Sequence, residues 1–276
     1  MTQWLIMVYL FVIGLFFGSF FNCMADRLSN NKSIFFPGSH CDNCKHKLTW
    51  YELIPVFSYI FQGGKCSKCK VKLSILYPLS ELLTGILFAL SFYVFGFSYQ
   101  TLTSIIVVSV FVTTLMSDAK YMIILDEILV AGIVLFSIVD LFDAGLIDVA
   151  SRFIYGLVLF SIMLLIKVFG DSAFKQESLG WGDIKLSFFV GLVLGIKLGI
   201  LYIFFGAFLA LPYAIFQSIR KKSNILPFGP FLVLAFLIIF MNMDLFNSFI
   251  TRLYGGLIWK SIYYILFSFF SYLLLL

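Results

Sequence analysis

The segment Gly180-Trp181-Gly182-Asp183-Ile184-Lys185-Leu186 stands where a polar loop gives way to an apolar run that continues to Phe216. Its two glycines allow the backbone a tight turn or a close approach to another element. Asp183 follows at the expected start of a helix, where a carboxylate can cap free N–H groups and meet the positive end of the helix dipole. Asp183 therefore has two interpretations, a helix cap or a catalytic acid. The second requires another acid at the same membrane depth.

The composition places this helix start in a membrane protein. Of the 276 residues, 62% are hydrophobic and 12% are charged, and the mean hydropathy is +1.05. A soluble domain has about a quarter of its residues charged. We therefore expect an all-α polytopic membrane protein, with the lipid bilayer as its surroundings. The net charge of +5 is interpreted as a signal of topology, so we expect no nucleic-acid partner.

Apolar runs predict eight or nine transmembrane helices. The first occupies residues 1–22, and no basic residue precedes it, so we expect a retained helix rather than a cleaved signal peptide. Its Gly14 and Gly18 form a G-x-x-x-G pair, which is either a packing face or two ordinary glycines of a membrane helix. The remaining spans form a core over residues 78–276.

Within that core, the run Ile184–Phe216 is too long for one span of about 20 residues. We expect two short spans that turn near Gly195–Gly199. The runs Phe231–Phe240 and Leu257–Leu276 complete the predicted count.

Residues 23–77 form the one long polar segment and hold four of the five cysteines, as Cys41-x-x-Cys44 and Cys66-x-x-Cys69. Two residues between thiolates let a tight turn aim both sulfurs at one tetrahedral ion. Two such pairs in a reducing compartment favour a structural Zn²⁺ over redox chemistry. His40 and His46 flank the first pair and could replace a thiolate, although four thiolates suffice.

The basic residues set the predicted orientation. If the loop 23–77 faces the cytoplasm and the spans alternate, all but four of the 19 lysines and arginines lie on or near that side. The N-terminus then lies outside. The four exceptions are Arg152, Lys197, Arg252 and Lys260.

In this orientation Asp118 lies at the end of a span that runs towards the cytoplasm. Asp183 lies at the start of a span that runs away from it. The two acids therefore share one depth. Two such carboxylates could share a proton and activate water, as in aspartic proteases. The alternative is that they are two interfacial charges that never meet.

Several independent motifs, in the same order, resemble the bacterial type IV prepilin peptidases, the aspartic G-x-G-D class of membrane proteases. The two cysteine pairs resemble the cytoplasmic zinc loop of that family. The other matching segments are Gly18-Ser19-Phe20-Phe21-Asn22 with Arg27-Leu28, Tyr77-Pro78-Leu79 with Glu81-Leu82, Gly180-x-Gly182-Asp183 with Lys185-Leu186, and Pro227-Phe228-Gly229-Pro230.

The resemblance implies an aspartic endopeptidase of the bacterial cell membrane. It implies removal of the leader peptide from type IV prepilins or pseudopilins at the cytoplasmic face, with Asp118 and Asp183 as the catalytic acids. The family's first motif usually has a Pro-Asp pair where this chain has Leu125-Asp126, which leaves the local backbone shape open. The supporting residues that the resemblance implies are Gly180, Gly182, Asp126, Glu127, Glu81 and Lys185.

Many family members also methylate the new N-terminus with S-adenosylmethionine. This chain has no glycine-rich nucleotide fingerprint, so that activity rests on the resemblance alone. Two other classes of protein stay open. A transporter could use Asp118, Asp183 and Glu81 to carry protons or ions, which explains the acids but not the zinc loop. A scaffold of a pilus or secretion machinery would use the acids structurally.

Overall fold

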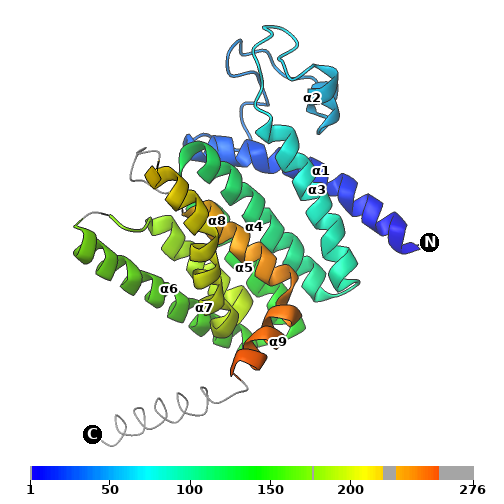
Figure 1. The fold of residues 1–276 in the computed structure, drawn as a ribbon. Coiled ribbons are helices and arrows are strands. Elements are labelled where there is room, and N and C mark those ends of the chain that lie inside the picture. The colour runs from blue at the N-terminus through cyan, green and yellow to red at the C-terminus, as the bar shows by residue number, and fades with distance from the viewer. Residues whose placement is uncertain (1, 176, 220–227, 255–276) are drawn as a thin grey trace, which may run out of the picture.

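The chain folds into a bundle of helices topped by an irregular loop (Figure 1). The structure, a computed structural model, describes residues 2–175, 177–219 and 228–254. Within these residues the helical prediction is confirmed, since the only extended pairings are two isolated bridges in the loop. The helices are α1 (Thr2–Ser29), η1 (Trp50–Leu53), α2 (Phe57–Phe61), α3 (Leu76–Phe95), α4 (Tyr99–Tyr121), α5 (Asp126–Asp143), α6 (Leu146–Phe174), α7 (Trp181–Ile219), α8 (Gly229–Met241) and α9 (Met243–Tyr254).

Helices α1 and α3 cross at small residues. A Cβ built on Gly14 would lie 2.7 Å from the Cα of Gly85, and one on Gly18 would lie 2.7 Å from the Cα of Glu81. No side chain fits at such distances, so the two backbones touch. The G-x-x-x-G pair of α1 is therefore a packing face, because close backbone approach replaces the hydrophobic effect as the source of helix association in lipid.

Helix α7 folds back on itself at Gly195, which has φ 71° and ψ −178°. The rings of Phe189 and Tyr202 both contact Phe236 of α8, with centroids 5.9 and 6.4 Å away. In a straight helix, the thirteen-residue separation would place the rings of Phe189 and Tyr202 about 20 Å apart. The predicted turn near Gly195 is therefore present, and its two arms lie against the same part of α8 (Figure 1).

Five described helices are long and apolar enough to cross a membrane, or six if the pair α8–α9, bent by 88°, forms one span. This count is below the predicted eight or nine for identifiable reasons. Helix α5 carries four acids among its 18 residues, and the two arms of α7 count as one helix. The predicted span Leu257–Leu276 lies outside the described residues.

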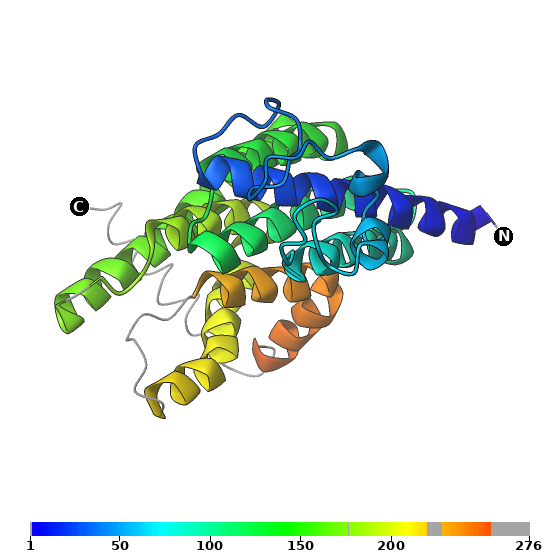
Figure 2. The same ribbon diagram turned by 90° about the horizontal axis from the view of Figure 1, so that it is seen from above.

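The loop between α1 and α3 lies over the ends of these two helices, as the view from above shows (Figure 2). Lys120, near the end of α4, forms an ion pair with Asp26 of α1, whose Oδ1 lies 2.6 Å from the Lys120 Nζ. The Asp26 Oδ2 accepts a hydrogen bond of 2.7 Å from the hydroxyl of Tyr77 in α3. Three helix ends are thus tied together directly beneath the loop.

Candidate active site and metal centre

The four predicted cysteine ligands converge. The sulfur atoms of Cys41, Cys44, Cys66 and Cys69 all lie within 4.8 Å of one another. The Cys41–Cys69 and Cys44–Cys66 distances are 3.8 and 3.9 Å. A tetrahedral zinc with Zn–S bonds of about 2.3 Å requires sulfurs about 3.8 Å apart. These two distances match the tetrahedral spacing, so the cluster can hold one tetrahedral metal ion.

Both cysteine pairs are built in the same way. The N–H of the first cysteine bonds the carbonyl five residues later, from Cys41 to His46 and from Cys66 to Val71. The residue after each second cysteine, Lys45 or Lys70, has a positive φ of 57°. This repeated turn points both sulfurs of a pair inward, which explains the C-x-x-C spacing.

Glu52 ties the two cysteine turns together. Its Oε2 accepts hydrogen bonds of 2.8 Å from the Thr49 N–H and 2.7 Å from the Thr49 hydroxyl, and its Oε1 accepts one from Ser67. Burial alone would raise the pKa of Glu52, but the hydrogen bonds from Ser67 and Thr49 outweigh it and hold the pKa at about 2. His46 lies 3.3 Å from the same carboxylate. The histidine therefore supports the carboxylate, and the sulfurs are left as the metal ligands.

Asp118 and Asp183 lie at facing helix ends, with Gly229 between them. A Cβ built on Gly229 would lie 2.7 Å from the Asp118 Oδ2 and 3.3 Å from the Asp183 Oδ1. The two oxygens are therefore no farther apart than the sum of these distances. The two residues are 8% and 7% exposed, and the Asp118 Oδ2 has no hydrogen-bond partner in the described part of the chain. The structure thus brings the two predicted acids together, at the first residue of α8.

The glycines of the G-x-G-D segment allow this meeting. A Cβ on Gly182 would lie 2.7 Å from the Cβ of Ile124, in the link that follows α4. The start of α7 can therefore pack closely against the link just after Asp118. A Cβ built on Gly180 would lie 3.4 Å from the Asp183 Oδ2, so Gly180 lies directly beside this carboxylate. Asp183 stands in the first turn of α7 and also faces Asp118, so a position at a helix start is compatible with the acid interpretation.

Leu125, which stands where the family usually has a proline, has a backbone conformation that proline could also adopt. Leu125 precedes α5 with φ −80° and ψ 121°. Proline fixes φ near −65°, within about 15°. The backbone shape at Leu125-Asp126 is therefore close to what Pro-Asp would give.

The other predicted supporting residues are divided among different places. Lys185 and Asp126 form an ion pair of 2.6 Å that joins the starts of α7 and α5. Glu127 is exposed beside it. Glu81 is buried, and its Oε2 accepts a hydrogen bond of 2.7 Å from the N–H of Val56 in the loop. Glu81 therefore anchors the loop to α3, and it lines the space beneath the loop.

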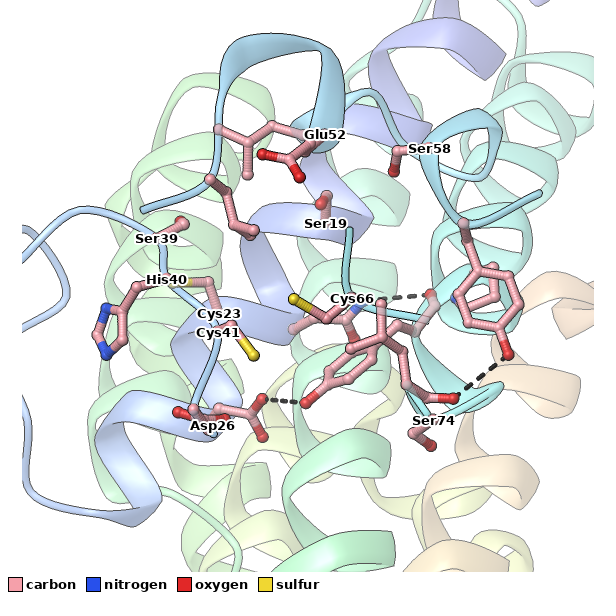
Figure 3. A pocket seen from close by; sticks show the side chains of 18 of the residues that line it. Ser19, Cys23, Asp26, Ser39, His40, Cys41, Glu52, Ser58, Cys66 and Ser74 are labelled. Carbon is pink, nitrogen blue, oxygen red and sulfur yellow. Dashed lines mark hydrogen bonds between the residues drawn. The ribbon is translucent and has the colours of Figure 1, made fainter. Parts of the chain in front are cut away.

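A cavity of about 470 Å³ separates the loop from the helix ends. Figure 3 shows Asp26 of α1 and Cys41 and Cys66 of the loop around it. Tyr121, the last residue of α4, also lines the cavity and stands three residues after Asp118. The sequence did not indicate this cavity, because it forms only where the loop folds back over α1, α3 and the end of α4.

These features define a class of multi-pass membrane protein that has a four-cysteine centre above a buried pair of carboxylates. Comparison with known proteins identifies the family. Residues 12–95 match the bacterial peptidase A24 N-terminal domain, and residues 105–215 match the type IV leader peptidase family. The chain belongs to the type IV leader peptidase family, which confirms the resemblance seen in the sequence.

Individual relatives extend the match over most of the chain. A prepilin leader peptidase/N-methyltransferase of Bacillus subtilis (strain 168) is 31% identical over 256 residues, which cover 90% of this chain and 98% of the relative. Proteins with the same name are 35% identical in Myxococcus xanthus (strain DK1622), over 64% of this chain and 52% of the relative, and 30% identical in Neisseria gonorrhoeae, over 80% and 77%. No solved structure matches.

Proposed function

We propose that this protein is the membrane aspartic endopeptidase that removes the leader peptide from type IV prepilins or pseudopilins. The observation that carries the proposal is the meeting of Asp118 and Asp183 beside Gly229, at the end of the bundle that bears the loop. Family membership favours this function over a transporter or a scaffold, because the relatives are named as leader peptidases.

The chemistry follows from two carboxylates that face one gap. One carboxylate removes a proton from the water that attacks the scissile carbonyl, and the other gives a proton to the departing amine. No covalent enzyme intermediate forms. The Lys185–Asp126 ion pair, which joins the starts of α7 and α5, is proposed to hold the position of Asp183 relative to Asp118.

The four cysteines are proposed to hold one structural Zn²⁺, which links the two turns of the loop. The loop, the start of α7 and the end of α4 are proposed to face the cytoplasm, with the N-terminus outside. Helix α5, the two arms of α7 and the run Leu257–Leu276 would then raise the number of crossings to the predicted eight or nine.

A second activity is proposed from the names of the relatives, which include N-methyltransferase. In this proposal, S-adenosylmethionine supplies the methyl group for the new N-terminus.

The test is co-expression with a prepilin, followed by mass spectrometry of the product N-terminus. Asp118→Asn and Asp183→Asn should each abolish cleavage while membrane expression stays near wild type, because each removes one half of the acid–base pair. Asp126→Asn should reduce cleavage less. If Asp183→Asn cleaves at a rate comparable to wild type, the aspartic mechanism is wrong.

A further inference from the structure

We propose that the loop between α1 and α3 docks on a lipid surface that contains anionic phospholipids. The docking surface is an apolar rim on the loop, which we define as Phe35, Phe36, Trp50, Tyr51 and Leu53. All five side chains of this rim are exposed. The rim lies outside the aspartate site, so its role goes beyond the proposed function and does not depend on it.

The first part of the rim is an ordered turn. Arg27 donates hydrogen bonds of 3.1, 2.7 and 2.6 Å to backbone carbonyls within residues 33–37. The Ser33 Oγ accepts hydrogen bonds from the N–H groups of Phe35 and Phe36. The side chains of these two phenylalanines are nevertheless 78% and 79% exposed. Large apolar side chains held in water are costly, and a patch of them marks an interaction surface.

The second part of the rim faces outward from η1. Glu52 points inward to the cysteine turns, whereas Trp50, Tyr51 and Leu53 on either side of it are exposed. The rings of Trp50 and Tyr51 pair edge to face, with their centroids 5.9 Å apart. Trp and Tyr concentrate at the membrane–water interface, because each has an apolar ring and a group that donates a hydrogen bond. The chemistry of the rim therefore matches a lipid interface.

The rim continues the lipid-facing surface of α1. The loop runs back along this helix (Figure 2), and a groove of about 280 Å³ lies between them. Phe16 and Phe20 of α1 line this groove together with Phe35 and Leu53 of the rim. Helix α1 is long and apolar enough to cross a membrane, so we expect its exposed phenylalanines to face lipid. The lipid that covers α1 can therefore extend over the groove and the rim.

The charge of the loop favours anionic lipid. All seven lysines of residues 31–75 are exposed, and none forms an ion pair with a described acid. The same residues contain two acids, Asp42 and Glu52. Even with the negative charge that a zinc ion and four thiolates would add, the lysines leave the loop cationic. Basic side chains beside a membrane are attracted to anionic headgroups. A negatively charged lipid surface thus complements both the rim and the lysines.

The experiment places a photo-cross-linker on the rim of the full-length protein in lipid nanodiscs. In the variant Phe36→p-benzoylphenylalanine, irradiation should attach phospholipid to the turn of residues 33–37, as read by mass spectrometry of the peptide. Trp50→p-benzoylphenylalanine tests the second part of the rim in the same way. The matched control is Asp42→p-benzoylphenylalanine, because this exposed acid of the same loop lies outside the rim and should face water.

The role of charge is tested in nanodiscs of phosphatidylcholine with and without phosphatidylglycerol. Phosphatidylglycerol should raise the yield of lipid adduct at position 36 about fivefold or more, since each lysine near the surface contributes a preference of about that size. The double substitution Lys47→Glu with Lys68→Glu should remove most of this increase. Lys47→Arg with Lys68→Arg keeps both charges and should keep the increase.

Nanodiscs that also hold a prepilin distinguish the possible occupants of the rim. Adducts to prepilin or to a second copy of the chain in place of lipid, equal lipid yields at positions 36 and 42, or yields that ignore phosphatidylglycerol would each overturn the proposal. The Tm of each variant is compared with that of the wild type, and the two rim positions serve as independent probes. Leader cleavage is no part of this measurement, so its absence refutes the proposed function alone.

Discussion

The most demanding test of the proposed site is the substitution Gly229→Ala, which adds one methyl group at the first residue of α8. The new Cβ would lie 2.7 Å from the Asp118 Oδ2, 3.2 Å from the Asp118 Cγ and 3.3 Å from the Asp183 Oδ1. The first distance is below any that real Cβ atoms adopt. The Asp118 carboxylate must therefore turn or shift by roughly half an ångström, and the gap between the two acids becomes smaller.

The expected effect is on catalysis more than on folding. A displacement of about 1 Å in a reacting group costs about 100-fold in rate. A hundredfold loss corresponds to about 2.7 kcal/mol in transition-state free energy. The added methyl also occupies space that water or the scissile peptide needs. Because the shift is about half of that displacement, we expect Gly229→Ala to lower kcat by between about 10-fold and 100-fold, with a smaller change in KM.

The control is Gly206→Ala, which creates a contact of equal closeness with the same helix. Its Cβ would lie 2.7 Å from the Cδ2 of Leu232 in α8. Leu232 belongs to the apolar core, so this substitution disturbs the packing of α8 without touching either carboxylate. The assay is time-resolved cleavage of a purified prepilin. If Gly229→Ala cleaves prepilin at the wild-type rate, or if both variants lose the same fraction of the cleavage rate, the space beside the aspartates has no special role.

The remaining predictions concern the loop and the helix contacts. Zinc analysis should find about one ion per chain, and Cys44→Ser should lower this content; no zinc in fresh membranes, or a disulfide within a cysteine pair, would contradict the metal assignment. Glu52→Gln should speed zinc release to a chelator at pH 7, because the charged carboxylate holds Thr49 and Ser67 together. The pKa of Glu52 is lowered from 4.5 to about 2 in the folded loop, so its stabilisation is complete above pH 4.5 and declines as the pH falls towards 2. In protein stripped of metal, the difference in thermal stability of the loop between wild type and Glu52→Gln should shrink over that interval; a constant difference would refute the role of the charge. Gly85→Leu should separate α1 from α3 and lower the Tm of the protein in detergent, because its Cβ would lie 2.9 Å from the Phe11 carbonyl oxygen; an unchanged Tm would refute the packing argument.

Local patterns in the sequence predicted much of the fold. The C-x-x-C pairs specify their own turns, so the sulfurs could be expected to meet. The length of the apolar run Ile184–Phe216 required a turn, which the glycines predicted near Gly195–Gly199 and the structure places at Gly195. The common depth of Asp118 and Asp183 followed from the positions of the basic residues. These inferences worked because each depends on spacing within one segment or on the thickness of the bilayer.

Contacts between distant segments could not be predicted in this way. Nothing in the spacing shows that Glu52 bridges the two cysteine turns, or that Asp26 joins the ends of α3 and α4. Both depend on tertiary packing. Glu81 was predicted as a supporting residue, and its contact with the loop could not be read from the sequence. The position of Gly229 between the aspartates also needed the structure, because α8 follows Asp118 by more than a hundred residues.

The reversal at Gly195 determines at which end of the bundle α8 begins. Because α7 enters the bundle and returns, an even number of passages separates Asp183 from Gly229, and both can stand at one face. A straight α7 would deliver the start of α8 to the opposite face, out of reach of Asp118. The left-handed φ of 71° at this residue is readily available only to glycine. The backbone conformation of this one residue therefore allows the start of α8 to lie beside the two aspartates.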